Sequence, residues 1–303
     1  MNLDSLTRKL NEYRFRMTAR RIRETPLIAG SGRPQDPIIL SMVQKKDVDM
    51  YLLAVKSFAR YVTASRFVVV ADPSLDDEDR ACIQRHLSPI EIVDASHFHQ
   101  PGIPVGGTWE RLTAVVSLCA DAFVIQLDAD TVTVDSPALV IDCIAEGRAF
   151  TLGTGQGREV VSTTEAAAFA CQLVEKGGRH VQVQCETHLA GIGDRFQRYV
   201  RGCSGFTGFS RGCANIEDLL VINRHFGDLL GERWTSWGTE QFASNLLLAN
   251  VPSVQVLDIN AYHAPYSDMP NLSFLHFIGP LRFKNGLYRQ DAARVIAELG
   301  AKA

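Results

Sequence analysis

The feature that most constrains the fold is an alternation of short apolar runs with helical patterns in the first half of the chain. Apolar runs lie at 38–43, 67–70, 90–93 and 123–127, and helical patterns separate them at 48–61, 76–86 and 108–120. This order requires right-handed crossovers and gives a mostly parallel sheet with helices on both faces. Ligands bind such sheets at the carboxyl ends of the strands. The sequence therefore predicts an α/β fold with its chemistry at those ends.

The first 37 residues differ from the rest. Leu3, Leu6, Leu10, Tyr13 and Met17 recur at helical spacing among seven Lys and Arg residues, and a linker rich in Pro and Gly follows. The pattern predicts an amphipathic basic helix that either packs on the domain or contacts an anionic lipid surface or a partner. We expect residues 38–303 to form a single domain.

Charge and cysteine content exclude several classes of function. The formal net charge of −3 over 303 residues argues against nucleic-acid binding by the whole molecule. The seven cysteines are odd in number and form no C-x-x-C pair, which favours reduced thiols and a cytoplasmic protein. No stretch is long and apolar enough for a spanning helix, so any membrane contact is expected to be peripheral.

Two carboxylates follow the fourth apolar run directly. Asp128 and Asp130 come straight after Phe123–Leu127, where two acids can share Mg²⁺ or Mn²⁺ with the oxygens of a diphosphate. The metal would neutralise charge on a leaving nucleotide. A capped turn, in which the Asp oxygens accept backbone N–H groups, explains the same pair without a metal. The Asp pair therefore leaves both interpretations open.

Three distant segments carry residues that suit the same chemistry. Arg111 begins the helix that precedes the Asp pair, and guanidinium groups pair bidentately with phosphate oxygens. Near the end of the chain, His276, Gly279 and Arg282 combine an imidazole, a flexible backbone and a cation. A third segment opens a helix with Glu240 and Gln241.

The ordered set of motifs resembles glycosyltransferase family 8, whose members have the GT-A nucleotide-sugar transferase fold with a Rossmann-like central sheet. The family motifs T-Y-x-R-L, D-x-D, D-Q-D-x-x-N and H-x-x-G-x-x-K correspond here to TWERL, QLDAD, EQFASN and HFIGPLR, in the same order between about residues 38 and 285. Three positions depart from the family: Arg282 replaces Lys, Glu240 replaces Asp, and Phe242 replaces the second Asp. The 41–45 stretch also lacks the acidic residue that helps to hold uracil.

The resemblance implies a role for each matching residue. Asp128, Asp130 and His276 would hold the metal, usually Mn²⁺. Arg111 would contact the donor, Gly279 and Arg282 the diphosphate, and Glu240 and Gln241 the reacting sugar. Thr207 and Gly208 lie in a segment similar to the small-residue turn that lines the sugar pocket.

The resemblance also implies a reaction and a division of the domain. The expected reaction is hexosyl transfer, with retention, from a nucleotide-diphosphate sugar, UDP first, to a saccharide, lipid-linked or protein acceptor. Residues 38–152 would form the nucleotide-binding half. Residues 153–303 would form the acceptor half and the metal and diphosphate segment, of which 262–287 would close over the donor.

Other functions remain open from the sequence, among them nucleotidyl transfer and a dinucleotide-binding oxidoreductase. Asp128 and Asp130 also fit the first motif of haloacid-dehalogenase-like phosphatases, in which the first Asp attacks phosphorus. That motif normally follows the first strand of the fold, whereas three predicted strands precede it here. A non-catalytic relative that binds a sugar nucleotide would retain part of the same motifs. Trp234 and Trp237, just before Glu240, fit either core packing or an indole under a sugar ring.

Overall fold

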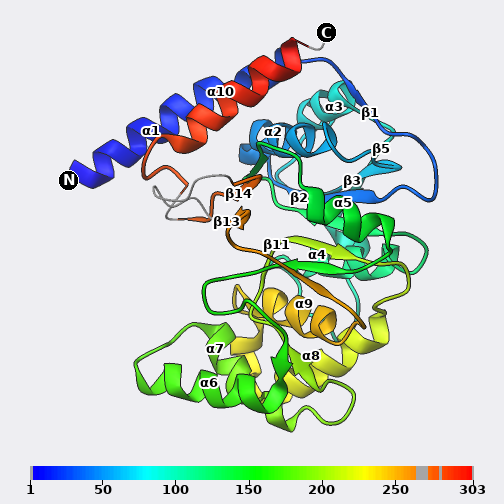
Figure 1. Cartoon of the computed structure of the whole chain (residues 1–303), viewed down its shortest axis with the longest axis vertical. Coiled ribbons are helices and arrows are strands. Elements are labelled where there is room, and N and C mark those ends of the chain that lie inside the picture. Colours follow the sequence, from blue (N-terminus) through cyan, green and yellow to red (C-terminus); the bar gives the residue numbers. More distant parts are fainter. Residues whose placement is uncertain (1–2, 264–271, 280–281, 302–303) are drawn as a thin grey trace. The chain divides into compact units, whose positions relative to one another are not determined.

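The computed structural model describes residues 3–263, 272–279 and 282–301 of the chain (Figure 1). The chain forms two compact units. Unit 1 comprises Met1–Asp94, Leu127–Ile141 and Asn260–Ala303, and unit 2 comprises Ala95–Gln126 and Asp142–Ile259. The functional division at residues 37 and 152 stays a prediction.

A parallel β-sheet forms the centre of unit 1. Its strands pair in the order β2-β3-β5, and their bounds are Ile38–Val43 (β2), Arg66–Ala71 (β3) and Ile90–Asp94 (β5). Helices α2 (Val48–Ala59) and α3 (Asp77–His86) connect these strands in chain order, and β1 (Ile28–Ala29) pairs with β4 (Leu87–Ser88) beside them. The β-branched and apolar side chains of β2 and β3 are almost all buried because a parallel sheet is covered on both faces.

A second, three-stranded sheet in unit 1 joins distant parts of the chain. Its order is β13-β14-β7, with bounds Tyr262–His263 (β13), Phe274–His276 (β14) and Thr131–Thr133 (β7). β14 runs antiparallel to β7, and His276 lies opposite Thr131 in the register. This pairing brings a segment near the end of the chain to the residues that follow the Asp pair.

The first and last helices of the chain lie side by side in unit 1 (Figure 1). They are α1 (Leu3–Ala19), which continues as the short η1 (Arg20–Glu24), and α10 (Leu287–Gly300). The rings of Phe15 and Tyr288 stack at 3.9 Å between centroids, and Tyr288 stacks on Phe277 at 4.0 Å. This aromatic column ties both helices to the residue after His276. One face of the N-terminal helix therefore packs on unit 1, and a contact of its other face with a lipid surface or a partner stays a prediction.

Unit 2 combines helices with a mixed sheet. β12 (Gln255–Leu257) runs parallel to β8 (Phe150–Leu152), and β8 runs antiparallel to β11 (Cys203–Phe209). Beside this sheet β9 (Val161–Ser162) pairs with β10 (Arg198–Tyr199). The helices are α4 (Trp109–Leu118), α6 (Thr163–Glu175), α7 (Val181–Thr187), α8 (Ile216–Leu230) and α9 (Thr239–Ala249). α5 (Ala138–Ala145) begins in unit 1 and ends in unit 2, and β6 (Val124–Leu127) ends where the chain returns to unit 1.

The expected α/β class with a mostly parallel sheet is confirmed. The expected elements between 38 and 127 occur within a few residues of their predicted bounds. Within the described residues, no helix is both long enough and apolar enough to cross a bilayer.

Candidate active site

The Asp128–Asp130 turn is held by buried strands on both sides. All four residues of β6 and all three of β7 are buried. The hydroxyl of Ser41 on β2 donates to the carbonyl of Leu127 at 2.6 Å, and Thr131 Oγ1 donates to the carbonyl of Asp128 at 2.8 Å. These bonds fix the backbone of the turn, so the two carboxylates project from a rigid support.

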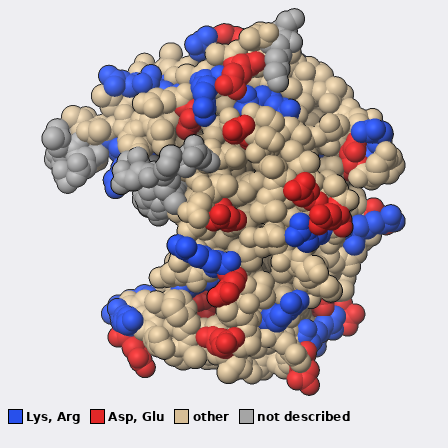
Figure 2. Space-filling view, viewed as in Figure 1, with Lys and Arg blue, Asp and Glu red and all other residues tan. Residues whose placement is uncertain are grey.

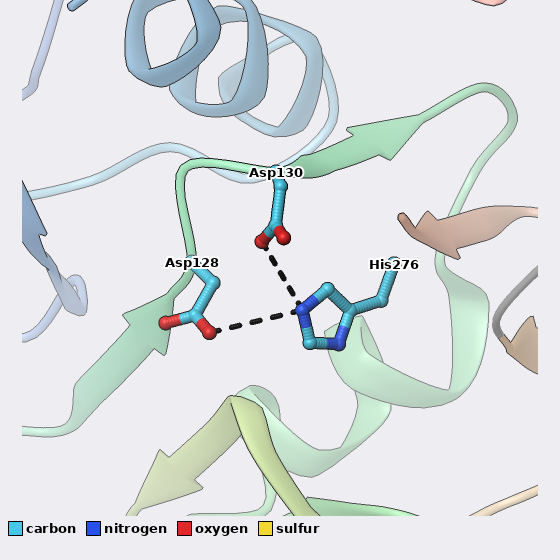
Figure 3. Close-up of side chains that lie close together, drawn as sticks. All are labelled: Asp128, Asp130 and His276. Atoms are coloured by element: carbon cyan, nitrogen blue, oxygen red, sulfur yellow. Dashed lines mark hydrogen bonds and ion pairs between the residues drawn. The ribbon is translucent and has the colours of Figure 1, made fainter. Parts of the chain in front are cut away.

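His276 reaches the same turn from β14 (Figure 3). Its Nε2 lies 3.1 Å from Asp130 Oδ1 and 3.7 Å from Asp128 Oδ2. Next to it, the N–H of Phe277 donates to the carbonyl of Asp130 at 2.9 Å. One ligand atom from each of the three side chains lies within 4.8 Å of the others. The structure therefore brings together the three residues expected to hold a metal.

Asp130 is an ionised carboxylate held between two nitrogen groups. Burial alone would raise the pKa of Asp130, but the neighbouring His276 and Arg282 outweigh it and lower the pKa to about 2. The guanidinium of Arg282 bonds Asp130 Oδ2 through Nη2 and the carbonyl of Phe277 through Nε. The two carboxylates suit Mg²⁺ or Mn²⁺, and the imidazole is a ligand typical of transition metals, which favours Mn²⁺. The residues present thus fit a divalent cation.

Gly279 lies three residues beyond His276 and has an unusual backbone conformation. Its φ is +23°, and among the described residues no atom lies within 4 Å of a Cβ built on it. A glycine lets a backbone come close to a diphosphate. Its role toward diphosphate stays a prediction, and part of the expected closing segment, 264–271 and 280–281, lies outside the described residues.

Arg111 and Glu240 form a buried ion pair in unit 2. Arg111 on α4 lies 3.0 Å from Glu240 on α9, measured from Nη2 to Oε2. Glu240 Oε2 also accepts hydrogen bonds from the hydroxyls of Thr108 and Ser204. Both charged side chains are less than a tenth exposed. Arg111 therefore has a partner that its motif alone did not reveal, and its contact with the donor stays a prediction.

Gln241 is oriented by a chain of buried polar groups in unit 2. Its Oε1 accepts from the N–H of Ser204 at 3.2 Å, and its Nε2 donates to Gln182 Oε1 at 2.8 Å. Gln182 in turn donates to Glu186 and to the hydroxyl of Tyr199. Glu186 pairs with Arg201 at 2.7 Å, and burial raises the pKa of Glu186 despite that cation.

The sequence motifs did not include Gln182, Glu186, Tyr199 or Arg201. The available signal was the Gln182/Glu186 spacing of one helical turn, which places both side chains on the same face of α7. Glu186, Tyr199 and Arg201 also line a cavity of about 520 Å³ in unit 2, together with the 155–159 turn and Phe169.

Thr207 and Gly208 lie on a strand, so the expected turn at 205–209 is wrong. They belong to β11 and face Thr151 and Phe150 in the register with β8. A Cβ on Gly208 would lie 2.2 Å from the Phe150 ring, so packing requires glycine there. All seven residues of β11 are buried, so the segment lacks the polar alternation of a strand with one solvated face. Their role beside the sugar stays a prediction.

The two tryptophans before Glu240 have different environments. Trp234 is buried and donates its indole N–H to Asn223 at 2.7 Å. Trp237 is 70% exposed, and its ring lies edge-on to His180. Of the two expected alternatives, core packing holds for Trp234 and not for Trp237.

Comparisons with known proteins give a match by structure alone. No protein-family model and no curated protein matches the sequence. An active-site variant of LgtC, a galactosyltransferase, matches with a TM-score of 0.53 at 13% identity, over 86% of this chain and 95% of that one.

Two further structures match less well. Mouse xyloside xylosyltransferase 1 has a TM-score of 0.48 at 11% identity, over 84% and 99% of the two chains. Core-mannan synthase A from Aspergillus fumigatus, in an Mn/GDP form, has a TM-score of 0.46 at 12% identity, over 91% and 88%. The first of the three matches carries the conclusion: this chain has the α/β fold of GT-A glycosyltransferases.

Proposed function

We propose that this chain is a metal-dependent glycosyltransferase that moves a sugar from a nucleotide-diphosphate donor to an acceptor. The observation that carries the proposal is that Asp128, Asp130 and His276 converge, each with one ligand atom within 4.8 Å of the other two. They do so in a chain with the GT-A fold. We expect a UDP-sugar donor, Mn²⁺ or Mg²⁺, a hexosyl group and retention of configuration. The acceptor would be a saccharide, a lipid-linked molecule or a protein.

One group of site residues would bind the metal and the diphosphate of the donor. A bound divalent cation would supply positive charge for the departing diphosphate. Asp128, Asp130 and His276 would hold it. Asp130 could exchange its Arg282 partner for that cation, and the Arg282 guanidinium would then pair with diphosphate oxygens. Gly279 would let the backbone approach the same oxygens.

Glu240 and Gln241 would contact the reacting sugar. Glu240 and Gln241 open α9 next to each other, and Ser204 hydrogen-bonds both side chains. A carboxylate and an amide fixed in this way are preorganised to stabilise charge that develops on the sugar. Such electrostatic stabilisation of the transition state is the largest contribution to the rate enhancement of many enzymes. Arg111 would act through Glu240 as well as on the donor. We place the reaction in the cytoplasm because all seven cysteines are free thiols.

A thermal-shift panel tests the proposal directly. UDP-, GDP- and ADP-sugars are each added with Mn²⁺ or with EDTA, and ligands that bind the native state raise its stability by mass action. At a hundredfold excess over Kd the gain is about 2.7 kcal/mol. We expect the largest shift with a UDP-sugar and Mn²⁺ together, and almost none with EDTA.

Other outcomes identify the alternatives. Stabilisation by a phosphate mimic such as beryllofluoride, with no response to nucleotide sugars, would indicate the phosphatase chemistry of the Asp pair. Against it, the pair follows β6, which comes after β2, β3 and β5 in the chain. Donor binding without release of UDP over a panel of acceptors would indicate a non-catalytic relative.

A further inference from the structure

The outer face of α1 is an apolar stripe that the protein leaves exposed. Leu6, Leu10, Tyr13 and Met17 are 50%, 45%, 64% and 55% exposed. Their spacing of three and four residues puts them on one face of the helix. Scattered exposed apolar residues are ordinary, whereas four aligned on one helix form a continuous surface.

The helix does not need this stripe for its own packing. Phe15, Ala19 and Ile22 are buried, and they project from the opposite side of the segment toward the rest of unit 1. The two faces of α1 therefore have separate functions. One anchors the helix, and the other remains available for contact.

Basic side chains border the stripe. At 100° per residue, Lys9 and Arg16 lie on one flank and Arg14 on the other, and all three are exposed. The segment 3–24 carries seven cations and three carboxylates, in a chain whose net charge is −3. Lys9, Arg14 and Arg20 make no ion pair with a carboxylate among the described residues, while Arg16 and Arg23 pair with Glu12 and Asp49. Figure 2 shows blue Lys and Arg side chains, with red Asp and Glu side chains among them, where Figure 1 places α1 and α10.

We propose that the stripe Leu6–Leu10–Tyr13–Met17 and its basic flanks dock on an anionic lipid surface, with α1 lying in the plane of the interface. An apolar face bordered by cations is the pattern of interfacial helices, whose binding combines apolar burial with attraction to anionic headgroups. A second copy of the chain fits less well. A two-fold contact sets the same patch against itself, so cationic flanks would face cationic flanks.

Vesicle co-sedimentation tests this proposal independently of any transferase activity. The full chain is spun with vesicles of phosphatidylcholine alone or with a third of the lipid as phosphatidylglycerol. We expect binding to the anionic vesicles only, weakening as salt rises because surface charges are screened. The double variant Lys9→Gln/Arg14→Gln should lose about tenfold or more in partitioning, since each cation near such a surface contributes about fivefold.

The variant Leu10→Ser/Tyr13→Ser tests the apolar stripe, and we expect it to lose binding about tenfold or more. Both residues are exposed, so circular dichroism and Tm should match the wild type. The matched control is Val174→Ser/Leu229→Ser, two apolar residues of unit 2 that are 43% and 48% exposed; it should bind like the wild type.

Three results would overturn the proposal. They are no binding to anionic vesicles, equal binding by wild type and stripe variant, and equal binding to neutral and anionic vesicles. A dimer in sedimentation velocity that the stripe variant abolishes, with no vesicle binding, would assign the stripe to a second copy instead.

Discussion

At the scale of single residues, the environment of Asp130 explains how a buried carboxylate can stay ionised and available to a metal. Asp130 is buried, yet two nitrogen groups keep its pKa at about 2. It is therefore ionised near neutral pH and ready to bind a cation without first losing a proton. Asp128, a quarter exposed, completes the pair from the side open to solvent.

The variant Asp130→Asn should lose Mn²⁺ affinity by at least about 100-fold. Asn keeps the size of the side chain but removes the charge that the cation requires. Titration calorimetry with Mn²⁺ measures the effect, and circular dichroism checks the fold. The control is Asp135→Asn, an exposed acid five residues along the chain. Unchanged Mn²⁺ affinity in Asp130→Asn would show that the metal site lies elsewhere.

The sequence predicted these residues better than it predicted their neighbours. The D-x-D pair was visible because a buried run ends directly at it. His276 could be assigned only by resemblance, since its approach depends on the antiparallel pairing of β14 with β7 across more than a hundred residues. Such pairing has no local signal. In the Gln182 to Arg201 chain, only the Gln182/Glu186 spacing is local; Tyr199 and Arg201 meet that pair only after folding.

At the scale of elements, the parallel strands of unit 1 were predicted correctly from their short apolar runs. Most helices of unit 2 were not predicted. α8 could have been found, because Asn215 caps it and Leu219, Ile222 and Phe226 are spaced for a buried face. α7 spans only Val181–Thr187, about two turns, and a helix of that length carries too few periodic positions to read. Its stability comes from packing.

The contact between α4 and α9 contains the buried ion pair of Arg111 and Glu240, in which each charge is stabilised by the other. Replacing Arg111 by Met should destabilise the protein by about 3–5 kcal/mol, because Glu240 would remain buried without its cation. The double variant Arg111→Met/Glu240→Gln should cost clearly less than the sum of the two single variants. Urea unfolding of all four proteins measures the coupling. Additive effects would mean that the pair contributes no mutual stabilisation.

At the scale of the whole molecule, a buried pair of basic groups sets how stability responds to acid. Lys56 Nζ lies 3.0 Å from His86 Nδ1 and donates to Thr25 Oγ1 and the carbonyl of Pro26. Burial, and then the charge of Lys56, lower the pKa of His86 from 6.5 to about 4. Between about pH 6.5 and pH 4, His86 is therefore neutral in the folded protein but protonated in the unfolded chain.

This difference makes the free energy of unfolding decrease as the pH drops. As the pH drops from about 6.5 toward 4, His86 becomes protonated in the unfolded state but stays neutral in the folded state. The free energy of unfolding therefore decreases by up to about 3 kcal/mol in total. The variant His86→Gln cannot titrate, so the stability of the wild type relative to it should decline by part of that amount between about pH 7 and pH 5. Urea unfolding of both proteins across this range, without metal or nucleotide, measures the decline. A difference that stays constant with pH would show that His86 protonates equally in both states, and that its contact with Lys56 does not persist in solution.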